Sequence, residues 1–183
     1  MLTLDLNRIR TAQERFERVY RPDQLTKESD FSIVDPVSLA FDIFNPGAGA
    51  PGVGKAKEQF RLVGDVKTVL ELPCSRCLEP FQHGVDSHFD LRYQPHAANT
   101  GEAEREIEED DLSTAFYEND EIDLGQLMRE QFYLALPMKP LCAEDCLGLC
   151  PLCGTNLNKG ACGCKRDWED PRLAALKTLK RDS

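Results

Sequence analysis

The chain has 183 residues, of which 41% are hydrophobic and 30% are charged, and its net charge is −10. These proportions are typical of a globular protein and exclude an intrinsically disordered chain. No apolar run approaches the roughly 20 residues that a transmembrane helix needs, and the first residues lack the apolar core of a signal peptide. We therefore expect a cytoplasmic protein without a membrane partner.

The negative charge is concentrated in one segment. Residues 102–123 contain eleven acidic residues and one basic residue, whereas the rest of the chain balances at 21 of each. Non-specific binding to nucleic acid requires lysine and arginine to neutralise phosphates, and the overall charge opposes it. An RNA contact would have to come from local patches. Residues 1–21 and 159–183 have small basic excesses, but such excesses are also common on ordinary surfaces.

The first quarter of the chain predicts two strands separated by a helix. Apolar residues alternate over residues 1–6 and again over 39–43, as in half-buried strands. Residues 11–20 are polar with scattered apolar positions, and we predict a short helix there. Residues 45–54 are rich in glycine and proline, which predicts a loop.

The clearest strand signal lies in the middle of the chain. Apolar residues share one parity over residues 60–72, and the pattern resumes over 85–93. The short connection between these runs contains Cys74 and Cys77. Two long strands with a short connection predict an antiparallel hairpin that has a Cys-x-x-Cys motif at its tip.

The second half predicts a loop, a helix and a cysteine-rich tail. Residues 94–120 lack periodicity and are acidic, which predicts an exposed loop. Asp123 is a good N-cap for a helix that ends at Pro137. A segment rich in cysteine and glycine follows at 141–164, and a short closing helix is predicted at 170–180.

These elements predict an α+β fold: an antiparallel β-sheet with one core helix, a small cysteine-rich zinc module and a C-terminal helix. We expect four regions along the chain. They are a mainly antiparallel β domain with the Cys-x-x-Cys hairpin tip at 1–100, an acidic flexible loop at 101–120, the core helix at 121–140, and a zinc-knuckle module with the tail helix at 141–183.

Eight cysteines are the main anomaly of the composition. Disulfides do not persist in a reducing compartment, so clustered cysteines point to metal ligands or redox centres. The sequence Cys150-Pro-Leu-Cys153-Gly154 has the form of a zinc knuckle, in which glycine allows the positive φ of the turn. Soft thiolates in tetrahedral geometry favour Zn²⁺, which would also order a segment with few apolar residues.

The eight thiols divide into two sets of four, each joining two close pairs. One zinc would be held by Cys150, Cys153, Cys162 and Cys164, and a second by Cys74, Cys77, Cys142 and Cys146. The alternative is one zinc among the six late cysteines, with Cys74 and Cys77 free. Either arrangement makes the zinc structural.

No catalytic residue is predicted. A Cys-x-x-Cys motif is also the thioredoxin signature, but that chemistry requires a helix N-terminus in a βαβ context, and this motif lies between antiparallel strands. A zinc ion with four protein ligands keeps no open position for water or substrate. The three histidines lie outside any known catalytic motif.

Several segments, in order, resemble the YceD family, the large ribosomal RNA subunit accumulation proteins of bacteria and plastids. The resemblance covers most of the chain from about residue 62. The matching segments are LELPCSRCLEPF (70–81), EIDLGQLMREQFYLALPMKPLC (121–142), CLGLCPLCGTNLN (146–158) with CGC (162–164), and DPRLAALKTLK (170–180).

The resemblance implies a non-catalytic role in accumulation or processing of large-subunit (23S) ribosomal RNA, through binding of precursor rRNA or pre-50S particles. Its motifs single out Arg76 and all eight cysteines but mark no RNA-contacting position. Arg76 either offsets the charge of the neighbouring thiolates or contacts RNA. An alternative function is an acidic, zinc-stabilised adaptor that captures a basic ribosomal protein or a nuclease through the acidic run at 106–111.

Overall fold

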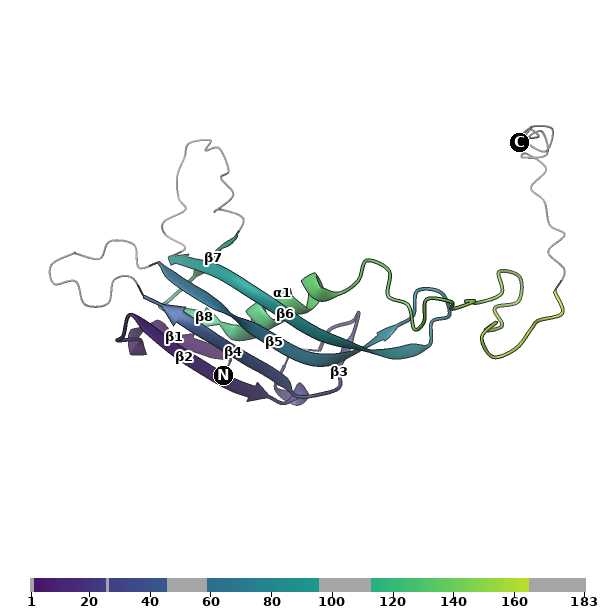
Figure 1. The fold of residues 1–183 in the computed structure, drawn as a ribbon, viewed down its shortest axis with the longest axis horizontal. Helices are drawn as coiled ribbons and strands as arrows, with labels where there is room; N and C mark the ends of the chain where they lie inside the picture. Colours follow the sequence, from purple (N-terminus) through teal and green to yellow (C-terminus); the bar gives the residue numbers. More distant parts are fainter. Residues whose placement is uncertain (1, 26, 46–58, 96–112, 165–183) are drawn as a thin grey trace, which may run out of the picture.

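The computed structural model describes residues 2–25, 27–45, 59–95 and 113–164. In these ranges a long, curved sheet carries one α-helix on one face, and the cysteine-rich segment extends from one end of the sheet (Figure 1). This is the predicted α+β class. No helix within these ranges is long and apolar enough to cross a membrane.

The main sheet has six strands. They are β2 (Gln13–Tyr20), β4 (Val37–Phe44), β5 (Phe60–Pro73), β6 (Pro80–Pro95) and β7 (Thr114–Tyr117) in spatial order, with β3 (Ser32–Ile33) pairing beside β4 onto β5. The β5–β6 pair is the predicted antiparallel hairpin, in register from Phe60 opposite Tyr93 to Pro73 opposite Pro80. The β6–β7 pair is parallel, so the sheet is not antiparallel throughout.

A small second sheet and the helix complete the fold. Strand β1 (Thr3–Asp5) pairs with β8 (Glu121–Asp123), and helix α1 (Leu124–Ala135) follows directly. The side chain of Asp123 accepts a hydrogen bond of 3.0 Å from the backbone N–H of Gln126, which confirms the predicted N-cap. Two short 3-10 helices, η1 (Leu6–Arg8) and η2 (Pro22–Gln24), lie in the first connections.

The core lies between the inward face of the main sheet and the layer formed by β1, β8 and α1. Strands β4 and β5 alternate buried and exposed side chains, as their sequences predicted. Phe41 of β4 and Phe132 of α1, both 2% exposed, are the largest fully buried side chains. Burial of this apolar surface holds the long hairpin in position, and with it the Cys-x-x-Cys motif at its tip.

The outward face of the sheet is polar and its charges are paired across strands. Lys67 lies 2.8 Å from Asp86, and Arg61 donates to Asp90 at 2.7 Å. Cross-strand pairs of opposite charge suit neighbouring positions on a solvated sheet face. Basic side chains on this face are therefore neutralised by neighbouring carboxylates.

The helix predicted at 11–20 is wrong, because these residues form strand β2. Its arginine, glutamate and glutamine residues have moderate to high helix propensity, but their pairing along all of β4 overrides that preference. The strand lies at the edge of the sheet with one face in solvent, which explains its polar composition. Phe16 points inward and stacks on Phe41, with ring centroids 5.3 Å apart.

The loop predicted at 94–120 is wrong at its C-terminal end, where Thr114–Tyr117 forms β7. A tight turn then joins β7 to β8, with Asn119 and Asp120 at φ values of 54° and 57°. Asparagine and aspartate tolerate this left-handed conformation better than other non-glycine residues. Residues 96–112 of the predicted acidic loop lie outside the described residues, as do most of the loop at 45–54 and the closing helix at 170–180. The four-region division of the chain stays a prediction.

Candidate metal centres

The connection between β5 and β6 is a knuckle turn around Cys74 and Cys77. The backbone N–H of Cys74 donates to the carbonyl of Glu79 at 2.9 Å, and the carbonyl of Cys74 accepts from the N–H of Leu78 at 2.9 Å. Leu78 has a φ of 60°, in the left-handed region that favours glycine. This closed turn leaves both sulfurs on the inner side, where Cys74 is 0% and Cys77 is 4% exposed.

The same turn recurs around Cys150 and Cys153. The N–H of Cys150 donates to the carbonyl of Thr155 at 2.8 Å, and its carbonyl accepts from Gly154 at 2.9 Å. Gly154 has a φ of 72° and occupies the place that Leu78 holds in the first knuckle. The two Cys-x-x-Cys motifs are therefore equivalent in backbone structure, although only the second has the expected glycine.

Two groups of four thiols result. The first, the hairpin centre, contains Cys74, Cys77, Cys142 and Cys146, and the second, the tail centre, contains Cys150, Cys153, Cys162 and Cys164. In each group the sulfur atoms all lie within 4.8 Å of one another. In the hairpin centre the sulfur of Cys74 lies 3.8 Å from that of Cys146. Four convergent thiols fit a tetrahedral ion such as Zn²⁺, which needs no other ligand.

These groups are the two sets inferred from the sequence. The one-site alternative leaves Cys74 and Cys77 apart from the late cysteines, whereas the sulfur of Cys77 lies 3.7 Å from that of Cys142. Two groups that could each hold a metal ion are therefore present in the fold. Metal binding itself, the identity of the metal and the role of each thiol stay predictions.

Hydrogen bonds in the knuckles favour ionisation of Cys74, Cys150 and Cys153 by lowering the pKa of each thiol. Burial raises the pKa of Cys74, but backbone N–H groups near its sulfur more than offset this and lower the pKa to about 6. Hydrogen bonds from the side chain and backbone of Thr155 lower the pKa of Cys153 to about 6. Burial and the neighbouring thiols raise the pKa of Cys142 to about 12. A bound cation would favour the thiolate form of all four ligands.

Arg76 ties the tail to the hairpin tip. Its guanidinium donates to the carbonyls of Glu144 at 3.2 Å and Cys146 at 2.8 Å, and its own carbonyl accepts from the N–H of Leu149 at 3.0 Å. Gly148 allows this close approach, because a Cβ there would lie 3.0 Å from the Arg76 carbonyl oxygen. One nitrogen of the Arg76 guanidinium thus holds the backbone beside Cys146.

A second tie comes from the loop between the two cysteine pairs of the tail centre. The amide of Asn158 donates to the sulfur of Cys146 at 3.3 Å, and its oxygen accepts from the N–H of Leu147 at 2.8 Å. Lys159 lies 2.6 Å from a carboxylate oxygen of Glu79 in the first knuckle. Sequence reasoning did not single out these residues. The two asparagines of the segment TNLN (155–158), between Cys153 and Cys162, could have indicated these contacts, because asparagine side chains often bond to the backbone in turns.

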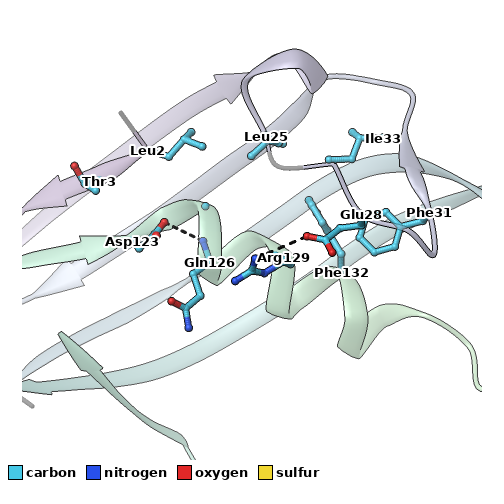
Figure 2. Close-up of a pocket in the computed structure, with 11 residues that line it drawn as sticks. Leu2, Thr3, Leu25, Glu28, Phe31, Ile33, Asp123, Gln126, Arg129 and Phe132 are labelled. Atoms are coloured by element: carbon cyan, nitrogen blue, oxygen red, sulfur yellow. Dashed lines mark hydrogen bonds and ion pairs between the residues drawn. The ribbon is translucent and has the colours of Figure 1, made fainter. Parts of the chain in front are cut away.

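A pocket of about 200 Å³ lies beside helix α1, between β1 and the segment that leads into β3 (Figure 2). Its walls combine apolar side chains, among them Leu25, Phe31 and Phe132, with polar and charged ones. Arg129 lies 3.8 Å from Glu28 and compensates its charge, and Asp123 adds a second carboxylate to the lining. No cysteine or histidine lines it, and we assign no chemistry to it.

The family model and the named relatives that match this chain point to the same family. Residues 62–180 match the family described as "Large ribosomal RNA subunit accumulation protein YceD". A chloroplastic large ribosomal RNA subunit accumulation protein, YCED homolog 1, from Arabidopsis thaliana is 27% identical over 86% of this chain and 53% of its own length. The corresponding maize protein is 29% identical over 62% of this chain and 46% of its own length.

A bacterial relative is similar over nearly its full length. The uncharacterized protein YlbN of Bacillus subtilis is 33% identical over 91% of this chain and 88% of its own length. The chain spans only about half the length of the two chloroplastic relatives. No solved structure matches this chain.

Proposed function

The chain belongs to the YceD family, and on that basis we propose that it is a non-catalytic factor for accumulation or processing of large-subunit (23S) ribosomal RNA. The printed names of the two chloroplastic relatives, which refer to large ribosomal RNA subunit accumulation, support this role. We propose that the partner is precursor rRNA or a pre-50S particle, and that the protein acts in the cytoplasm.

The pair of four-thiol centres is the observation that carries the proposed mechanism. Each centre would hold one structural Zn²⁺ with four protein ligands, so that neither ion could activate water or substrate. The hairpin centre joins the tip of β5–β6 to residues 142 and 146, and the tail centre closes the segment that follows. The zinc ions would make this end of the sheet a rigid surface for recognition.

The charge distribution supports recognition at the cysteine-bearing end rather than on the sheet. Lys67 and Arg61 on the open face are paired with Asp86 and Asp90. The cysteine-bearing end instead exposes apolar side chains, with Leu78 65% and Leu147 67% exposed. Exposed apolar side chains on a rigid surface are candidates for contact with a macromolecular partner.

Depletion of the protein in its own cell, followed by measurement of 23S against 16S rRNA, tests the function. We expect a lower ratio, restored by the wild-type chain and by the control variant Ser75→Ala but not by Cys77→Ser. The wild-type protein should also co-sediment with large-subunit precursors. A normal ratio after depletion, together with absence from these particles, would refute the proposal.

The alternative function is an adaptor that captures a basic ribosomal protein or a nuclease. The acidic segment at 102–123 favours it, because that segment carries the net negative charge of the chain. This function predicts binding to a purified basic protein that is lost when residues 106–111 are neutralised, without direct affinity for RNA. RNA binding by the purified chain that persists after this neutralisation would contradict it.

A further inference from the structure

Strand β2 leaves one edge of the main sheet open. Among the described residues it pairs with β4 alone, and it is the first strand in the spatial order of the sheet (Figure 1). An open edge is a template for a further strand, and proteins commonly use charged side chains to control which strand pairs there. Four of the five residues at 14–18, the centre of β2, are charged.

The backbone of β2 presents the groups that a further strand needs. The backbone N–H of Asn45 donates to the carbonyl of Ala12 at 2.9 Å. This bond continues the β2–β4 register, in which Gln13 lies opposite Phe44. Opposite residues in an antiparallel pair alternate between hydrogen-bonded and non-hydrogen-bonded positions. It follows that the even-numbered residues of β2 bond to β4, whereas the backbone N–H and C=O groups of the odd-numbered residues point toward the open edge.

The side chains of β2 are complementary to a second copy of the same strand. A twofold axis perpendicular to the sheet puts one residue of an antiparallel edge strand opposite itself and pairs the residues on either side of it. With Phe16 on the axis, Glu14 lies opposite the partner's Arg18, and Arg15 lies opposite the partner's Glu17. Each pair forms twice by symmetry, and opposite charges directly across two strands stabilise their pairing.

Other registers of the same contact are unfavourable. An axis at any of the four charged residues of 14–18 places two like charges directly opposite each other, which destabilises a strand pair. An axis near either end of β2 leaves most of the strand unpaired. The charges of β2 therefore select one register with a second copy and disfavour pairing with an arbitrary strand.

The register centred on Phe16 also continues an aromatic contact of the inward face. Phe16 is half-buried and lies opposite Phe41 of β4, with ring centroids 5.3 Å apart. Because the backbone of Phe16 bonds to β4, Phe16 takes a non-hydrogen-bonded position toward the partner strand, where opposite side chains approach most closely. A cavity of about 420 Å³ lined by Glu14, Phe16 and Arg18 leaves space on this face for the partner's side chains.

We propose that two copies of this chain associate through antiparallel pairing of β2, centred on Phe16, so that their sheets form one continuous sheet. The odd-numbered backbone groups bond across the axis, and the ion pairs flank a row of aromatic rings. The net charge of −10 opposes association, but physiological salt screens exposed charges beyond about 8 Å, whereas the paired charges are in contact. The dimer needs neither the metal centres nor the role in rRNA accumulation.

Sedimentation velocity of the full chain over a concentration series at physiological salt tests the dimer. Arg18→Glu and Glu14→Arg each make their cross-strand pair repulsive, and the double variant restores it with the charges exchanged. We expect the dimer dissociation constant to rise on the order of tenfold in each single variant and to return to within about threefold of wild type in the double variant. The control Lys139→Glu, at an exposed position after α1, matches the charge change of Arg18→Glu and should leave the constant unchanged.

Mixing the two single variants is the sharpest test. A mixed dimer places the two acidic positions of one chain opposite the two basic positions of the other, so we expect the mixture to dimerise more tightly than either variant alone. A wild-type chain that is monomeric throughout the series would overturn the proposal. Single variants that dimerise like the wild type, or a double variant that does not recover, would overturn it as well.

Discussion

The sheet body and the cysteine-bearing tail of this protein are stabilised by different chemistry. The body buries a continuous set of apolar side chains from nine of its elements, including Phe41 and Phe132. The buried cluster at the hairpin tip consists of Cys74, Cys77 and Cys146, with only Phe81 and Leu141 packed against it. Residues 141–164 cannot bury enough apolar surface to offset their conformational entropy.

The body and the tail should therefore lose their structure under different conditions. Loss of apolar packing should unfold the body, whereas loss of metal should disorder the tail and spare the body. The loop that contains Asn158 and Lys159 joins them, because Lys159 pairs with Glu79 at the hairpin tip and Asn158 donates to Cys146 of the hairpin centre.

Removal of metal should have the largest effect. A structural zinc contributes about 10–16 kcal/mol in small zinc-finger peptides, so chelation should abolish amide protection across 141–164 and leave β4 and β5 protected. Hydrogen exchange with mass spectrometry, before and after chelation and after zinc is restored, measures this. Elemental analysis should give two zinc ions per chain. One ion, or a metal-free chain with a protected tail, would contradict the two-centre interpretation.

Truncation of a core aromatic should destabilise the body. Phe132 is 2% exposed and meets Phe31 edge to face, with ring centroids 6.1 Å apart. We expect Phe132→Ala to lower the free energy of unfolding by about 3–5 kcal/mol in urea denaturation. The control Leu134→Ala, on the same helix but 77% exposed, should change it by less than about 0.5 kcal/mol. A loss of zinc in folded Phe132→Ala would show that the two regions are not separate.

Loss of the hydrogen bond to a ligand sulfur should weaken one centre without unfolding it. Asn158→Ala removes the donor to the sulfur of Cys146, and outer hydrogen bonds of this kind are typically worth 10–100-fold in metal affinity, which we expect here as roughly tenfold. Competition with a chromogenic chelator measures the affinity. Leu152→Ala, a change at a 54% exposed knuckle position, is the control and should have no effect.

The smallest effect concerns the ion pairs of the open face. The hydrogen bond from Arg61 holds the pKa of Asp90 below its usual value. A carboxyl group with a lowered pKa stabilises the folded state above its unfolded pKa, and this contribution is lost as pH falls through the folded value. The pair is half exposed, so we expect less than about 1 kcal/mol to be lost below about pH 4.

Urea denaturation of the wild type and of Asp90→Asn across this pH range measures that contribution. The variant should lack the acid-dependent loss, and the exposed control Asp23→Asn should retain it. If Asp90→Asn and the wild type lose stability in parallel as pH falls, the ion pair contributes nothing to the body.

Local signals predicted much of the fold and of the candidate site. Alternation over 60–72 and 85–93 predicted the hairpin, and Asp123 before an apolar stripe predicted the start of α1. Each of these signals lies within a single strand or helix. There, residues that are close in the sequence determine the side-chain period and the cap. The spacing of Cys150 and Cys153, with Gly154 after them, predicted a knuckle for the same reason.

The remaining features depend on partners that are distant in the chain. Residues 13–20 have a helix-like composition and become a strand because β4 offers them a full-length edge. Strand β7 forms by parallel pairing with β6, and no local sequence pattern predicts this pairing. Leu78 adopts a left-handed conformation that its side chain disfavours, because the knuckle closes around Cys74 and Cys77.

The sequence by itself determined which residues alternate, which residue begins the helix and that eight thiols fall into close pairs. It left open whether Cys74 and Cys77 stand alone or join the tail. The tertiary structure decided this, because the rigid hairpin carries their sulfurs to Cys142 and Cys146 more than sixty residues later. Local interactions define each pair of thiols, but only packing of the whole chain brings two pairs together.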